Sequence, residues 1–291
     1  MNNVTEHTQI ESKVAESILK SISIPPCPEV VMALMEEVRQ PEVDFAKIVK
    51  LISGDVGLAA SMLKTANSPF FALRTKVNSV QQAVSVLGLK NLSQIVRGSA
   101  LQNALGGDKV EMERYWDRSN FTAVVASHMA ARLEGVSRED AYTYGLFHDC
   151  GIPILMMKFP DYKEKLSASN KFAKLIIVIE DTNYATNHAQ VGNMLTRNWC
   201  LPEHISQAIL VHHDHSIFSK NSNHVSPLVC TLVAIQLVSE HIVATFLDKP
   251  DDAEWQISGP EAIDYLGLST EDMTDITEDA LGELEEIRAY R

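Results

Sequence analysis

The stretch that decides the fold, residues 138–149, reads REDAYTYGLFHD and predicts a helix that ends in an adjacent His-Asp pair. Within it, His148 follows Tyr144 by four residues and Ala141 by seven. Residues at these spacings share one face of a helix, so His148 is expected on the inward-facing stripe. With Asp149 it offers one nitrogen and one oxygen ligand from neighbouring backbone positions. This pattern is typical of a site for a first-row transition metal.

Two further histidine positions lie downstream, on segments that also predict helices. His188 shares a helical face with Leu195, and His212 follows Ile205 by seven residues. These are core-facing stripes, so the three histidines are expected to converge, with His213 beside them. A neutral imidazole is a good metal ligand, and a neighbouring carboxylate can accept its second N–H. The alternative is a hydrogen-bonded core network that holds no metal.

Most of the remaining chain shows the apolar periodicity and the breakers of helices, which predicts an all-α fold. The run Ile176–Ile179 is β-branched and is compatible with a short strand, but in this helical context we expect a buried helix. The other expected helices cover residues 30–38, 45–53, 56–67, 80–87, 89–105, 116–133, 183–199, 202–213 and 227–246. A final amphipathic helix after Ser269 carries Met273, Ile276, Ala280, Leu284 and Ile287 on one face.

Three of the expected helices carry explicit start signals. Asp44 and Asp55 stand directly before apolar periodic segments, as N-cap residues do. Ser79 with Gln82 has the spacing of a capping box, and Gly88 is expected to end the helix that this box opens. The helical assignment therefore rests on local chemistry as well as on periodicity.

Composition restricts the class of protein. The chain has 291 residues, of which 45% are hydrophobic and 22% charged, as in ordinary folded proteins. We expect a cytoplasmic protein with reduced cysteines, since no apolar stretch of membrane-spanning length and no signal peptide is evident. The net charge of −13 argues against general binding of nucleic acid. The sequence contains neither a Gly-x-Ser-x-Gly elbow nor a phosphate-binding loop.

The negative charge is concentrated at the C-terminal end. Residues 248–291 hold 14 acidic and 3 basic residues, a net of −11, so the rest of the chain carries −2. A solvated helical face explains such a segment, and a surface that docks a partner protein is the more specific alternative.

Several motifs, taken together, resemble the HDOD domain, a relative of the HD and HD-GYP metal-dependent phosphohydrolases. They span roughly Ser21 to Phe246 and are IPPCP (24–28), ISGDVGL (52–58), LKTANS (63–68), AVSVLGL (83–89), GLFHDCG (145–151), HAQVG (188–192), WCLP (199–202) and AILVHH (208–213). The resemblance implies a multi-helix HD-like bundle with an N-terminal helical subdomain. It also implies that His148 and Asp149 are the metal-binding pair and that His188, His212 and His213 are further ligands.

The chain departs from the pattern of the catalytic relatives in three places. Arg118 is the best match to an early ligand histidine, and Gln236 is the nearest match to a late ligand aspartate. In addition, no Gly-Tyr-Pro follows His213. Losing an anionic ligand and gaining a cation both weaken divalent metal binding, which argues against phosphohydrolysis. Arg118 is expected either to bind a phosphate or acidic group or to form an exposed salt bridge.

The sequence thus predicts a non-catalytic bacterial signalling module that binds a protein partner or a phosphate-containing small ligand. Its degenerate HD-type site is expected to hold iron, manganese or zinc. The alternative is a metal-dependent phosphohydrolase acting on a phosphodiester or a cyclic dinucleotide. We expect four segments: an extension over residues 1–20, an N-terminal helical half over 21–107, an HD-like half with the His/Asp cluster over 108–247, and an acidic helical segment over 248–291.

Overall fold

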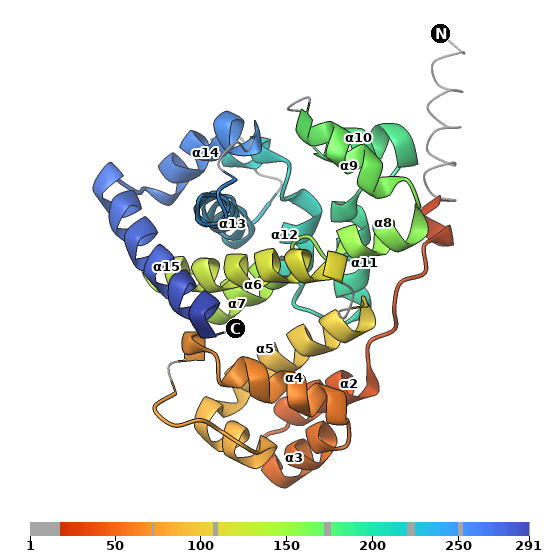
Figure 1. The fold of residues 1–291 in the computed structure, drawn as a ribbon, viewed down its shortest axis with the longest axis vertical. Coiled ribbons are helices and arrows are strands. Elements are labelled where there is room, and N and C mark those ends of the chain that lie inside the picture. The colour runs from red at the N-terminus through yellow and green to blue at the C-terminus, as the bar shows by residue number, and fades with distance from the viewer. Residues whose placement is uncertain are drawn as a thin grey trace. The chain divides into compact units, whose positions relative to one another are not determined.

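The computed structural model describes residues 18–71, 73–106, 110–171, 176–219, 225–249 and 253–290. Within these ranges every regular element is a helix, which confirms the expected all-α fold (Figure 1). The elements in chain order are α2 Glu29–Val38, α3 Phe45–Ser53, α4 Val56–Ala66, η1 Pro69–Phe71, α5 Val80–Ala104, α6 Val110–Ala130, α7 Arg138–Phe147, α8 Gly151–Lys158, α9 Tyr162–Lys171, α10 Ile176–Tyr184, α11 His188–Asn198, α12 Glu203–Val211, η2 His215–Phe218, α13 Pro227–Phe246, α14 Ala253–Leu266 and α15 Thr270–Tyr290.

The chain forms two compact units, each assembled from segments distant in sequence. The histidine unit comprises Met1–Pro25 and Leu146–Gly267, and the second unit comprises Pro26–Gly145 and Leu268–Arg291. The five predicted His and Asp ligands belong to the histidine unit, whereas Arg118 belongs to the second unit. The four segments expected from the sequence remain a prediction about domain organisation.

In the second unit, the predicted caps start the predicted helices. Asp44 accepts from the backbone N–H of Lys47 at 3.0 Å, and Asp55 accepts from that of Leu58 at 3.0 Å. Ser79 likewise starts α5, which Gly88 interrupts with a φ of 71°. A positive φ costs glycine little, so the chain changes direction there.

The C-terminal helix α15 packs inside the second unit. Its predicted apolar face is buried, from Ile276 to Ile287, and lies against α6 and η1. Arg132 pairs with Asp279, and His128 lies 3.3 Å from the carboxylate of Glu283. The amphipathic helix is therefore confirmed, and its remaining acidic residues are largely exposed.

The histidine unit is built around α13, which packs against α12 and α14 (Figure 1). Among the described residues, α13 is the one helix long and apolar enough to cross a membrane, which corrects the expectation that no apolar stretch reaches that length. However, 72% of its most apolar window is buried within the fold, as in the core helix of a folded domain.

Three local expectations are corrected in this unit. The run from Ile176 is helical, in α10, but Val178 is 51% exposed, and α10 buries Glu180 and Tyr184 instead. The helix expected over residues 183–199 begins only at His188, after a break with positive φ at Ala185. Finally, α7 ends one residue before the His-Asp pair, so the pair lies in a turn. Residues 172–175 lie outside the described ranges.

Candidate metal centre

Two glycines let the helices of the candidate site approach closely. A Cβ atom at Gly151 would lie 2.0 Å from the backbone oxygen of His188, and one at Gly192 would lie 2.9 Å from the Ile209 side chain. Only glycine tolerates such approaches. They place α8 against α11 and α11 against α12, so the segments that carry the predicted ligands meet.

The start of α11 is fixed by the residue before it. The Asn187 side chain accepts from the backbone N–H of Gln190 at 3.0 Å and donates to Asp181 at 2.8 Å. This N-cap makes His188 the first residue of the helix, where its side chain is fully buried. At the far end of α12, His212 and His213 directly follow its last residue.

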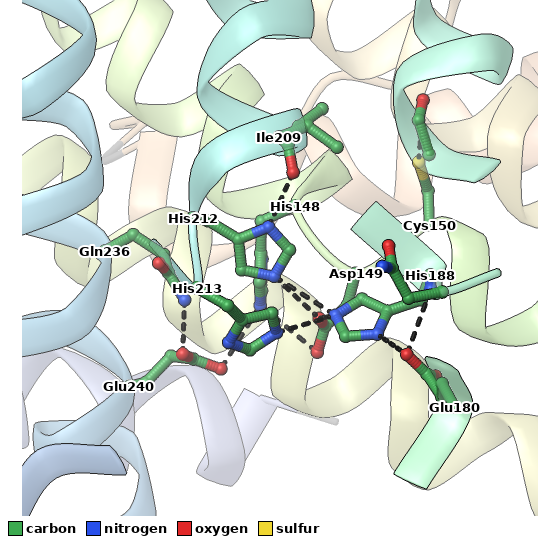
Figure 2. A network of polar contacts seen from close by, with 12 residues as sticks. His148, Asp149, Cys150, Glu180, His188, Ile209, His212, His213, Gln236 and Glu240 are labelled. Atoms are coloured by element: carbon green, nitrogen blue, oxygen red, sulfur yellow. Dashed lines mark hydrogen bonds and ion pairs between the residues drawn. The ribbon is translucent and has the colours of Figure 1, made fainter. Parts of the chain in front are cut away.

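The three histidine rings converge through their Nε2 atoms (Figure 2). The Nε2 atom of His188 lies 3.1 Å from that of His212 and 2.8 Å from that of His213. The Asp149 carboxylate faces the same point, with Oδ1 at 3.4 Å from His188 Nε2 and 3.8 Å from His212 Nε2. Four potential ligands from three separate segments therefore surround one position.

The hydrogen bonds at the three Nδ1 atoms determine which nitrogen of each ring carries the proton and which offers a lone pair. His188 Nδ1 lies 2.6 Å from Glu180, His212 Nδ1 lies 2.6 Å from the backbone oxygen of Ile209, and His213 Nδ1 lies 2.6 Å from Glu254. Carbonyl and carboxylate oxygens only accept, so each Nδ1 must carry the proton.

In the neutral rings, three Nε2 lone pairs then face one another. Lone pairs at this separation repel, whereas a divalent cation between them would be bound by all three. This donor set fits a metal, because outer acceptors that fix the tautomer are the usual support of metal-binding histidines. The arrangement distinguishes the cluster from an ordinary polar core network, in which N–H groups would point at the lone pairs.

A second group of potential ligands adjoins the first. His148 Nε2 lies 3.3 Å from Asp149 Oδ2 and 3.2 Å from Glu240 Oε1, and all three residues are buried. Glu240 also accepts from the side chain of Gln236, one turn earlier on α13. Gln236, the nearest match to a late acidic ligand, thus supports an acid rather than replacing it.

The sequence analysis missed Glu240. Glu240 lies within the helix expected over residues 227–246, which carries mostly apolar residues. The available signal was the spacing of four residues between Gln236 and Glu240, which puts two polar side chains on one face of an otherwise apolar helix. A buried carboxylate therefore lies beside His148, one helical turn after Gln236.

The cluster is surrounded by carboxylates, whose charge a cation or protons must balance. Burial opposes ionisation of His188, but the carboxylates of Glu180 and Asp149 raise its pKa. Burial opposes ionisation of His148, but the carboxylates of Asp149 and Glu240 raise its pKa to about 10. Burial would raise the pKa of Asp149, yet the charge of His148 holds it well below the usual value. Burial and the neighbouring His213 ring lower the pKa of His212 to about 4. Asp149 is thus an anion and His212 neutral at pH 7, as ligands must be, and a metal bound at His148 would displace its proton.

Glu180 holds the first histidine in place from α10. It is almost fully buried and accepts from both the backbone N–H (3.0 Å) and the Nδ1 atom of His188. The hydroxyl of Tyr162 donates to its other oxygen. No sequence signal identified Glu180, because it follows the β-branched run that was expected to be buried.

The structure brings together five of the six predicted site residues: His148, Asp149, His188, His212 and His213. His215, which was not among the predicted site residues, lies with its Nε2 atom 3.1 Å from Oε1 of Glu254, the acceptor of His213. Arg118 has an exposed side chain on α6, in the second unit. Its binding role remains a prediction.

Comparison with known proteins decides the family. The family model described as HDOD domain matches residues 24–215. The chain belongs to the HDOD family. An uncharacterized protein of Treponema pallidum is 28% identical over 215 residues, 73% of this HDOD chain and 42% of that protein. The cyclic di-GMP phosphodiesterase CdgJ of Vibrio cholerae is 28% identical over 133 residues, 45% of this chain and 30% of that protein. The HDOD chain thus spans less than half the length of these relatives.

Solved structures share the fold. An HDOD domain protein with unknown function from Geobacter sulfurreducens has a TM-score of 0.73 at 21% identity, with 97% of each chain covered. A Marinobacter aquaeolei VT8 protein, provisionally assigned to signal transduction, has a TM-score of 0.73 at 22% identity, covering 97% of this chain and 65% of that one. A Shewanella amazonensis SB2B protein, provisionally assigned as a metal-dependent phosphohydrolase, has a TM-score of 0.64 at 16% identity, covering 99% and 100%. At such identities the likeness is one of fold.

Proposed function

We propose that this HDOD protein is a bacterial signalling module in which the histidine cluster holds a divalent transition metal and the output is the binding of a partner protein. The observation that carries the metal assignment is the convergence of three Nε2 atoms whose Nδ1 atoms are all committed to acceptors. Support for the signalling role comes from the family and from the Marinobacter structure, which is provisionally assigned to signal transduction.

The residues proposed to hold the metal are His188, His212, His213 and Asp149, with His148 and Glu240 adjoining them. Imidazole and carboxylate ligands suit zinc, iron and manganese, in keeping with the metals expected from the sequence. When bound, such an ion would supply Lewis acidity and would tie together the turn before α8, α11 and the end of α12.

Burial favours a regulatory rather than a catalytic centre. His188 is 0% exposed, and His148 and His212 are 1% exposed. A hydrolytic metal needs an open coordination position and an approach for its substrate. A largely buried set of ligands is instead typical of a metal that stabilises a fold.

Elemental analysis of the full chain, purified without added metal, tests this proposal. We expect stoichiometric iron, manganese or zinc in the wild type, a loss of metal in His148→Ala and His212→Ala, and retention in His204→Ala. His204 lies on α12 outside the cluster, so it controls for histidine loss as such. A folded wild type that takes up none of the three metals would refute the metal centre.

A second candidate function is metal-dependent hydrolysis of a phosphodiester or cyclic dinucleotide. One observation favours it: Glu240 supplies a buried carboxylate beside His148. The relative CdgJ also bears the name of a cyclic di-GMP phosphodiesterase. Release of nitrophenolate from bis(p-nitrophenyl) phosphate, or of linear product from a cyclic dinucleotide, by metal-loaded wild type but not by His148→Ala would establish this activity.

For the partner protein we propose the exposed acidic face of α15. Deleting residues 248–291 does not test this, because it also removes the buried Ile276 and Leu284. Replacing exposed acids instead, as in Glu271→Gln with Glu278→Gln, leaves the packed face intact. Weaker capture of a regulator by this variant, with unchanged thermal unfolding, would support the proposal, and unchanged capture would refute it. Arg118→Ala tests the proposed phosphate-containing ligand. Weaker binding of that ligand by this variant would support a binding role for Arg118, and unchanged binding would refute it.

A further inference from the structure

Glu254 approaches the cluster from a helix outside the segment matched by the family, which ends at residue 215. One of its oxygens, Oε1, lies 2.6 Å from His213 Nδ1 and 3.1 Å from His215 Nε2. We infer that Glu254 is a positioning residue for the metal centre, and that metal binding is therefore linked to the docking of α14. This inference rests on the proposed metal-binding function.

Glu254 completes a set of three acceptors. Of the Nδ1 partners, Glu180 and the Ile209 carbonyl lie within the family-matched segment, and only the partner of His213 comes from α14. The carboxylate holds the His213 proton on Nδ1, which leaves the Nε2 lone pair directed at the metal position. Glu254 contacts His213 at Nδ1 and not at the ligating Nε2, so its effect on the metal acts through His213.

Loss of Glu254 would favour a competing state. Without the carboxylate, the His213 proton can move to Nε2, which lies 2.8 Å from His188 Nε2. His188 keeps its own proton on Nδ1 because of Glu180, so its Nε2 can accept. The resulting His213–His188 hydrogen bond would occupy both nitrogens and remove two ligands at once.

The placement of α14 does not depend on this contact alone. The Trp255 ring stacks on His241 of α13, with ring centroids 3.9 Å apart and an interplanar angle of 6°. Ser258 and Ala262 are buried, and α14 packs along α13. Packing against α13 thus fixes the helix, and Glu254 is presented to His213 from it.

Linkage makes this contact reciprocal. If the docked α14 raises the affinity for the metal, bound metal must raise the stability of the docked α14 by the same factor.

The test compares Glu254→Ala and Glu254→Gln with Glu261→Ala, an exposed acid on the same helix. Zinc affinity of the full chain is measured by chelator competition, and hydrogen exchange of α14 is measured with and without zinc. Loss of a supporting acceptor costs about 10–100-fold in metal affinity. We expect a loss in this range for Glu254→Ala, a smaller loss for Glu254→Gln, which keeps an acceptor oxygen, and wild-type affinity for Glu261→Ala.

Zinc should also slow hydrogen exchange in α14 of the wild type and of Glu261→Ala, but not of Glu254→Ala. A general packing role would not produce this difference. If the wild type binds zinc and Glu254→Ala binds it equally well with the same protection, the inference is wrong while the metal centre stands. If the folded wild type binds no metal, the proposed function fails first and the inference fails with it.

Discussion

The Nε2 atoms of His188 and His213 lie 2.8 Å apart, although a glutamate accepts from the Nδ1 atom of each ring. Two imidazoles so held cannot both be neutral and share a hydrogen bond. A cation or an additional proton must lie between them. The His212 ring, with Nε2 at 3.1 Å from that of His188, makes a metal the simplest resolution, because a proton can bridge only two of the three nitrogens.

Removing the metal should lower the thermal stability of the protein. A ligand present at about 1,000 times its Kd stabilises the folded state by about 4 kcal/mol. We therefore expect a chelator to lower the Tm of the wild type and to leave the already lower Tm of His188→Ala unchanged. Differential scanning calorimetry with and without chelator measures both. Equal responses of the two proteins would contradict a metal at His188.

Two glycine substitutions are expected to have opposite effects on stability, because Gly151 lies at the close contact of α8 with α11 and Gly282 does not. Gly151→Ala forces a Cβ atom against the His188 backbone and should cost about 3 kcal/mol and most of the metal. Gly282→Ala, in open space within α15, should stabilise by about 0.5–1 kcal/mol. Urea unfolding gives both free energies. Similar values for the two variants would show that the packing at Gly151 can relax.

Glu240 is expected to matter for folding as well as for ligation. Glu240→Ala removes the acceptor shared by His148 and Gln236 in a buried site, and breaking a buried ionic contact costs about 3–5 kcal/mol. Glu240→Gln keeps one acceptor and should cost less, while still reducing the metal content. Chemical unfolding and elemental analysis separate the two effects. If Glu240→Gln retains full metal, Glu240 is not a ligand.

The buried phenol of Tyr142 is expected to make the folded protein less stable at high pH. Burial raises the pKa of this phenol from 10 to about 12 in the folded protein. Between those values the unfolded chain binds fewer protons than the folded one, so the free energy of unfolding falls as pH rises. Two pKa units correspond to roughly 2–3 kcal/mol. Tyr142→Phe should flatten this part of the stability curve, and an unchanged slope between pH 10 and 12 would assign it to other tyrosines.

Much of the fold was predictable because its signals are local. The caps at Asp44 and Asp55 act on backbone N–H groups three residues away, so the chain need not be folded for them to be recognised. Before α11, one local signal overrode another. The break before His188 is stabilised by the cap Asn187, which the apolar periodicity of residues 183–199 concealed.

The sequence by itself determined the helices, their caps and the histidine positions, because periodicity and capping act within one or two turns. It also carried the motifs of the HDOD family. Only the tertiary structure revealed which acceptors fix the rings: His148 meets Glu240 across 92 residues, and His213 meets Glu254 across 41. Such partners have no fixed spacing in sequence. They depend on how α13 and α14 pack, and that packing, through the tautomer it imposes, decides what the histidines can bind.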